Sequence, residues 1–202
     1  MSFYDGFYKT FATPIKKLFR LEVKGAENLP DKGEGCLLCA NHTSLMDVVV
    51  ISAGLSRQVR YMAKKELFKI PLLKQLITAL GAYPVDRKGA DVAAIRKTVG
   101  MIEGGELVGI FPQGTRHPYV DPRETEVKNG VGMVAYRAKC KVVPVYIKTK
   151  KNHTIMFRKT EVIVGEPIEY DALGFEGGGT KEYKAASEYI FDKICSLGED
   201  DK

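Results

Sequence analysis

The chain has 202 residues, of which 45% are hydrophobic and 28% are charged, with 20 glycines and a formal net charge of +6. This length suits one large domain, and the composition excludes a disordered, collagen-like or disulfide-rich protein. The positive charge indicates an anionic partner, such as a phosphorylated metabolite, an acidic carrier protein, an anionic lipid or a nucleic acid. We expect no nucleic acid, because the basic residues are dispersed and no recognition motif is present.

The sequence also bears on location. No run of about 18 apolar residues occurs, so a membrane-spanning helix is excluded by length. Asp5 and Lys9 interrupt the segment where a signal peptide would have its apolar core, so we expect an intracellular protein. Cys36 and Cys39 lie in an apolar run that reads as a buried strand, where residues three apart point to opposite faces. We therefore interpret both as core residues that share neither a metal nor a disulfide.

Residues 1–20 form the first expected element, an amphipathic helix. Apolar residues recur every four positions, and the basic residues outnumber a single Asp5 by four to one. A broad aromatic stripe next to basic side chains is typical of a helix that lies in the interface of an anionic membrane. The alternative is a helix that docks on the protein's own core. The residues of the stripe are Phe3, Phe7, Phe11, Ile15 and Phe19.

From residue 21 onward, short strand-like runs alternate with helical periodicity. The pattern predicts a single α/β domain over residues 21–202, with a mixed, largely parallel sheet flanked by helices. The two last strands are adjacent in the chain, which leaves room for antiparallel pairing. The expected strands are 36–40, 58–62, 82–86, 107–112, 142–147 and 161–165, and the expected helices are 46–55, 71–80, 91–103, 129–138 and 181–196.

A polar turn follows the first buried strand and contains His42 and, five residues later, Asp47. In open α/β sheets, ligands bind at the carboxyl ends of strands. A carboxylate at this spacing can accept a hydrogen bond from one imidazole nitrogen, which leaves the other nitrogen to act as a base. No G-x-S-x-G nucleophile is present, so the pair suggests that the substrate supplies the attacking hydroxyl. The alternative is that Asp47 only caps the next helix.

Two further strand ends deliver Arg87 and the turn Gly114-Thr115-Arg116, and Lys128 precedes an expected helix. Guanidinium groups match phosphate oxygens with paired hydrogen bonds, so these residues predict a phosphate-binding wall. The three histidines lie in separate segments without ligand spacing, and we expect no metal and no cofactor.

Four blocks in this order, NHTSLMD, KKELFKIPLLKQLITALGAYPVDR, FPQGTR and VVPV, resemble the signature of the glycerolipid acyltransferase family over about residues 22–165. The resemblance implies transfer of a fatty acyl group from an acyl carrier protein or coenzyme A thioester to the 2-hydroxyl of lysophosphatidic acid, which gives phosphatidic acid. It also implies a peripheral, monotopic protein on the cytoplasmic face of the cell membrane, bound to an anionic surface.

The resemblance further implies a role for individual residues. His42 corresponds to the family's base and Asp47 to its partner, and the phosphate end of the acceptor falls to Arg87, Gly114, Thr115 and Arg116, with Lys128 beside them. Gln113, which we also expect to bind the substrate, stands where the family usually has Glu. Glutamine keeps an acceptor oxygen there but loses the charge. This departure keeps two alternatives open: an acyltransferase with another acceptor (glycerol 3-phosphate, a lysophospholipid or an aminolipid), and a non-catalytic lipid-binding protein.

Overall fold

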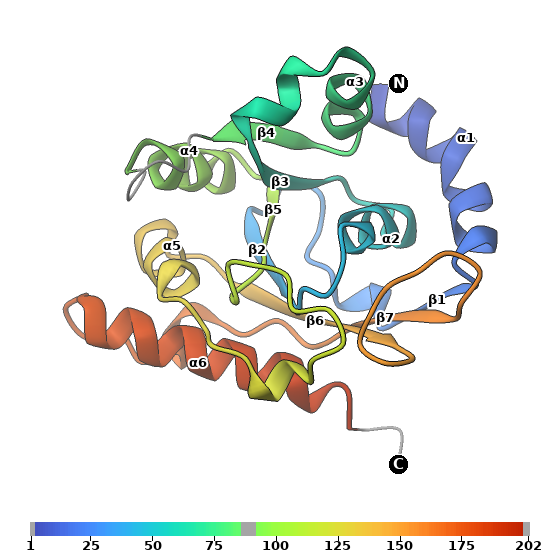
Figure 1. The fold of residues 1–202 in the computed structure, drawn as a ribbon. Helices are drawn as coiled ribbons and strands as arrows, with labels where there is room; N and C mark the ends of the chain where they lie inside the picture. The colour runs from blue at the N-terminus through green and yellow to red at the C-terminus, as the bar shows by residue number, and fades with distance from the viewer. Residues whose placement is uncertain (1–2, 86–91, 200–202) are drawn as a thin grey trace.

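The computed structural model describes residues 3–85 and 92–199, and within them seven strands form one sheet (Figure 1). The sheet order is β1-β7-β6-β2-β5-β3-β4. All neighbouring strands pair in parallel except β6 and β7, which are antiparallel. The predicted mixed, largely parallel sheet is therefore confirmed. The strands are β1 (Leu21–Lys24), β2 (Cys36–Ala40), β3 (Val59–Lys64), β4 (Ala82–Val85), β5 (Leu107–Ile110), β6 (Val142–Thr149) and β7 (Thr160–Val164).

Helices cover both faces of this sheet. Figure 1 shows α1 and α2 on one side and α4, α5 and α6 on the other, while α3 lies beside β4 and next to α1. The predicted helices after residue 21 all form, with ends that differ by at most one residue. The helices are α1 (Phe3–Leu18), α2 (Met46–Gly54), α3 (Pro71–Ala79), α4 (Val92–Glu103), α5 (Gly130–Ala138) and α6 (Thr180–Ser196).

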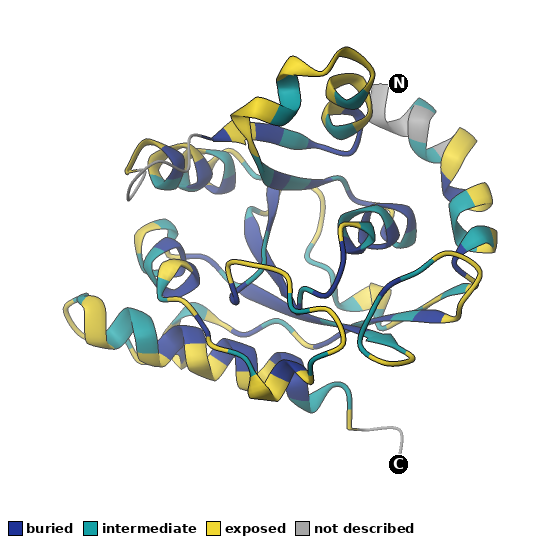
Figure 2. Cartoon of the chain, in the orientation of Figure 1, coloured by how far each residue is buried: buried dark blue, intermediate teal, exposed yellow. Residues whose placement is uncertain are grey.

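The three layers enclose two hydrophobic cores, one on each face of the sheet, and Figure 2 shows the buried sheet between helices with exposed outer faces. All five residues of β2 are buried. Cys36 packs in the core under α1 and α2, whereas Cys39 packs in the core under α4 to α6. The two thiols therefore face opposite sides of the sheet, as the strand periodicity predicted. Both are free.

Strand β1 was missing from the expected elements. It has only four residues, its burial alternates between partial and exposed, and it lies at the edge of the sheet. Its two charged residues form ion pairs, Lys24 with Glu161 and Glu22 with Lys159. A short edge strand with alternating charges carries little hydrophobic signal, so its pairing with β7 emerges only from the folded sheet.

Helix α1 packs against α2 and β1. The residues of the apolar stripe predicted for residues 1–20 do not all face the same way. Phe19, just after the helix, is 1% exposed in the core, whereas Phe11 is 47% exposed. At about 100° per residue, positions eight apart are rotated by about 80°, so a four-residue repeat drifts around the helix. The side chains of Phe3 and Phe7 lie outside the described residues. Within residues 3–85 and 92–199, no helix has both the length and the apolarity to cross a bilayer.

Candidate active site

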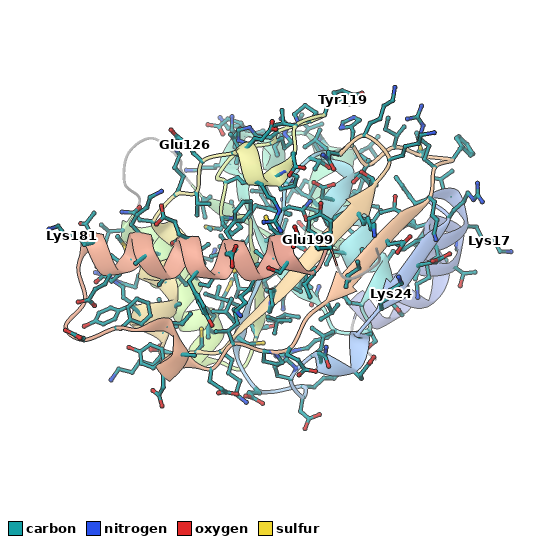
Figure 3. The ribbon with its side chains drawn as sticks, turned by 90° about the horizontal axis from the view of Figure 1, so that it is seen from below. Lys17, Lys24, Tyr119, Glu126, Lys181 and Glu199 are labelled. Atoms are coloured by element: carbon teal, nitrogen blue, oxygen red, sulfur yellow. The ribbon has the colours of Figure 1, made fainter. Side chains whose placement is uncertain are left out.

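Three adjacent central strands carry the candidate site at their carboxyl ends. Strands β6, β2 and β5 are parallel neighbours, so the segments that follow them meet at one edge of the sheet. His42 and Asp47 follow β2, residues 111–128 follow β5, and residues 150–159 follow β6. Figure 3 shows Tyr119 and Glu126, from the segment after β5, together along one edge of the molecule. This is the edge at which open α/β sheets bind ligands.

The expected contact between His42 and Asp47 is present. The Nδ1 atom of His42 lies 2.9 Å from Oδ2 of Asp47, whose side chain is fully buried. The same Oδ2 accepts the backbone N–H groups of Thr43, at 2.6 Å, and Ser44, at 2.8 Å. The Oδ1 atom accepts the hydroxyl of Thr154 at 2.6 Å. The carboxylate is thus held from several sides, and with Nδ1 donating to it, Nε2 of His42 keeps its lone pair.

The plane of the imidazole ring is set by an aromatic neighbour. Phe111, just after β5, stacks on His42 with ring centroids 3.8 Å apart and an interplanar angle of 12°. Tyr61 from β3 lies parallel to Phe111 at 6.1 Å. The His42 side chain keeps 15% of its surface exposed. Stacking on one face and the Asp47 contact at one nitrogen therefore hold the ring in one orientation.

Gln113 is a buried residue that holds the turn containing His42. Its side chain is 1% exposed, its Oε1 accepts the backbone N–H of His42 at 2.6 Å, and its Nε2 donates to Oγ1 of Thr125 at 2.8 Å. Thr125 in turn donates to the carbonyl of Pro122 at 2.6 Å. The amide that we predicted at the substrate is therefore bound by protein groups at both ends. It joins the His42 turn to the segment after β5.

The turn after Gln113 is exposed and lies beside the His42 turn. Gly114 has a φ of +71°, which favours glycine, and its N–H donates to the carbonyl of Phe111 at 3.0 Å. The N–H of His117 donates to the carbonyl of His42 at 2.9 Å, which brings the two turns together. Gly114, Thr115 and Arg116 are all exposed. A hydroxyl and a guanidinium are thus presented to solvent next to the turn that contains His42.

Lys128 and Arg87 are the other two cations of the predicted phosphate wall. Lys128 precedes α5, and its N–H donates to the carbonyl of Pro112 at 2.8 Å, which places it next to the exposed turn. Its side chain is exposed and forms an ion pair with Glu126 at 2.8 Å. Arg87 lies outside the described residues.

The loop between β6 and β7 contributes contacts that the sequence analysis missed. Besides the Thr154 bond to Asp47, Nδ1 of His153 lies 3.1 Å from the carbonyl oxygen of Thr43. The His153 ring packs against Tyr119 with centroids 4.6 Å apart. The one available signal was position, because this polar segment follows a buried strand. In the part of the chain that the structure describes, no group of three or more His, Cys, Asp or Glu side chains is placed to hold a metal ion.

This arrangement can perform general-base chemistry. An oriented imidazole with a free Nε2 can take a proton from a bound hydroxyl, and the buried carboxylate stabilises the imidazolium that forms. Comparison with known proteins shows the family of the chain. A family model described as Acyltransferase matches residues 20–148.

Individual relatives agree as well. A 1-acyl-sn-glycerol-3-phosphate acyltransferase of Bacillus subtilis is 32% identical over 168 residues, which cover 80% of this chain and 82% of that protein. One of Streptococcus pneumoniae is 31% identical, over 59% of this chain and 44% of that protein. The crystal structure of the 1-acyl-sn-glycerophosphate acyltransferase PlsC from Thermotoga maritima superimposes with a TM-score of 0.70 at 27% identity, covering 96% of this chain and 78% of that one. The chain therefore belongs to the acyltransferase family.

Proposed function

We propose that this protein transfers a fatty acyl group from an acyl thioester, of acyl carrier protein or coenzyme A, to the 2-hydroxyl of 1-acylglycerol 3-phosphate, forming phosphatidic acid. The observation that carries the proposal is the 2.9 Å contact between His42 and the buried Asp47, at the edge where open α/β sheets usually bind their ligands. The names of the relatives supply the substrate class, because the Bacillus subtilis and Streptococcus pneumoniae proteins are both named for this acceptor.

In the proposed reaction, Nε2 of His42 removes the proton of the acceptor hydroxyl as its oxygen attacks the thioester carbonyl. The tetrahedral intermediate collapses, the C–S bond breaks, and the imidazolium returns its proton to the leaving thiolate. Asp47 holds Nδ1 throughout and stabilises the imidazolium. No covalent acyl-enzyme is required, since the acceptor itself is the nucleophile.

The phosphate of the acceptor would bind the exposed turn beside the base. Thr115 and Arg116 present a hydroxyl and a guanidinium there, and Lys128 adds a cation that its pairing with Glu126 partly offsets. Arg87 would complete this group. Gln113 would act on the site indirectly, by holding the backbone of His42.

The protein would work at an anionic membrane surface on the cytoplasmic side. Both proposed lipids are amphiphiles, and α1 presents the exposed Phe11 together with the basic residues Lys16 and Lys17 in its last turn. An amphipathic element of this kind binds anionic bilayers through apolar burial and charge attraction.

The test is acyl transfer by the purified protein, with labelled 1-acylglycerol 3-phosphate and each thioester in turn. We expect His42→Ala to lose activity by about 10²–10⁴-fold, the usual contribution of general-base catalysis. A His42→Ala variant that is correctly folded and keeps more than a tenth of the wild-type rate would disprove the assignment of the base. Glycerol 3-phosphate, a lysophospholipid and an aminolipid serve as competing acceptors, and binding without turnover of any of them would support a non-catalytic lipid-binding protein instead.

A further inference from the structure

We propose that the loop between β6 and β7, residues 150–159, inserts its tip into an anionic lipid surface. The tip consists of Met156 and Phe157, and we call residues 150–159 the tip loop. This inference deepens the proposed function, on which it rests, by naming a second membrane contact besides α1. The sequence of the loop is KKNHTIMFRK, which combines a short apolar run with four cations and no acidic residue.

The two tip residues are presented to solvent. Phe157 is 76% exposed and Met156 is 47% exposed. Phe157 has a φ of +65°, a conformation that is rare for a bulky residue, and its N–H donates to the carbonyl of Leu18 at the end of α1 at 2.7 Å. The protein thus holds the backbone of an aromatic residue in an unfavourable conformation without burying its ring in the core. A binding partner for this ring would explain that arrangement.

Cations surround the tip. Lys150, Lys151 and Arg158 are exposed, and the neighbouring end of α1 adds exposed Lys17 and Arg20. Lys159 differs, because it pairs with Glu22 and Glu161 at 2.9 Å each. Figure 1 shows the loop beside the carboxyl end of α1, and Figure 3 shows Lys17 directed outward on that side of the molecule. The charge of this surface complements lipid phosphates.

A lipid bilayer fits this surface better than a protein partner does. The apolar side chains lie at the end of a loop and are flanked by cations, which matches an interface where acyl chains lie beneath a layer of phosphates. A specific protein complex would bury a larger, shape-complementary area. The positive charge of this surface would also suit an acidic carrier protein. The experiment below distinguishes a lipid bilayer from such a carrier protein.

The position of the tip loop relative to the base also favours a lipid surface. Two residues separate Phe157 from Thr154, whose hydroxyl donates to Asp47 at 2.6 Å. His153 contacts the carbonyl of Thr43 in the turn that bears the base. A bilayer in contact with the tip would therefore lie next to the site, and an acceptor lipid would have only a short distance to move to reach His42.

The experiment is co-sedimentation of the full chain with vesicles of phosphatidylcholine and phosphatidylglycerol in equal parts, and with vesicles of phosphatidylcholine alone. Phe157→Ser should weaken binding to the anionic vesicles about tenfold or more, the factor expected for removing one aromatic side chain from an apolar environment. The double variant Lys150→Gln, Lys151→Gln should weaken binding to the anionic vesicles and reduce its dependence on salt. Tyr189→Ser is the matched control, because Tyr189 is 39% exposed on α6, across the sheet from α1.

Thermal unfolding by circular dichroism accompanies each variant, and an unchanged midpoint is expected for a side chain as exposed as Phe157. If Phe157→Ser unfolds early, Met156→Ser carries the test in its place. If the folded tip-loop variants bind anionic vesicles as strongly as the wild type does, the inference is wrong. It is also wrong if these variants still bind vesicles but no longer bind an acidic carrier protein. A wild-type protein that binds vesicles through this loop but transfers no acyl group would disprove the proposed function alone.

Discussion

Thr154 donates a 2.6 Å hydrogen bond to Oδ1 of Asp47, although the two residues are 107 positions apart in the sequence. The bond fixes the oxygen that does not face His42, since the other oxygen is 2.9 Å from the imidazole. We interpret Thr154 as a positioning residue that keeps the carboxylate, and through it the imidazole of His42, in one orientation.

Thr154→Val should therefore lower kcat about tenfold, which corresponds to losing about 1.4 kcal/mol of transition-state stabilisation. The KM values for both substrates should change little, because Thr154 touches the carboxylate and not the substrate. Thr154→Ser, which keeps the hydroxyl, should retain most of the activity. Steady-state kinetics of the two variants check this, and a larger loss in Thr154→Ser than in Thr154→Val would show that the methyl group, not the hydroxyl, matters.

Gln113→Glu tests the departure from the usual third block of the family. A carboxylate cannot donate to Thr125 as the amide does, and the position is 1% exposed. We expect the free energy of unfolding to fall by about 1–3 kcal/mol, the usual cost of a buried polar group that loses a partner. The acceptor KM should stay near the wild-type value. Urea unfolding and kinetics measure the two effects, and a large change in acceptor KM alone would place position 113 at the substrate.

Arg116→Ala tests the phosphate contact. If the guanidinium binds the acceptor's phosphate, its loss should raise the acceptor KM about tenfold or more and leave the KM of the acyl donor nearly unchanged. Arg116→Lys should restore binding only in part, because a point charge cannot form the paired contact. Arg137→Ala, at an exposed position in the last turn of α5, is the control. If Arg116→Ala keeps the wild-type acceptor KM, Lys128→Ala is the next variant to measure.

Arg57 offers a test of the fold that is independent of the site. Its side chain is buried and donates to the backbone carbonyls of Pro30, Glu34 and Gly105, at 2.9, 2.5 and 3.0 Å. Arg57→Met should lower the free energy of unfolding by about 3 kcal/mol or more, since each carbonyl that loses its donor costs about 1–3 kcal/mol. Chemical denaturation measures the loss, and a change below about 1 kcal/mol, within the range of surface substitutions, would contradict the proposed role.

The reactivity of the four cysteines tests whether their side chains are buried. Burial raises the pKa of Cys140 to about 12 and that of Cys195 to about 11, and it also raises the pKa values of Cys36 and Cys39. Because alkylation needs the thiolate, only about a thousandth or less of the Cys140 and Cys195 thiols can react at pH 8. Iodoacetamide should therefore modify the folded protein very slowly and the unfolded protein at all four positions. Mass spectrometry follows the reaction, and rapid labelling of Cys39 in the native state would contradict the structure.

The sequence by itself determined the local parts of this protein. The buried strand β2, the turn after it and helix α2 are consecutive, so the five-residue spacing of His42 and Asp47 was enough to predict their contact. The exposed turn at Gly114 was predictable for the same reason, since a glycine that follows a strand marks a turn. Helix periodicity placed α2, α4, α5 and α6 because each of these helices buries apolar side chains against the sheet. The same periodicity placed α3, although Ala79 is its only buried residue.

Only the tertiary structure decided which distant residues meet at that turn. Gln113 and Thr154 reach His42 and Asp47 because β5 and β6 are the two neighbours of β2, and strand order is a property of the assembled sheet. The exposure of Phe157 was equally beyond the sequence, and for Phe11 the sequence left open whether the side chain faces a membrane or the protein's own core. A hydrophobic residue is buried or exposed according to what packs against it, and that packing is fixed when the layers come together, not by the residue's own side chain.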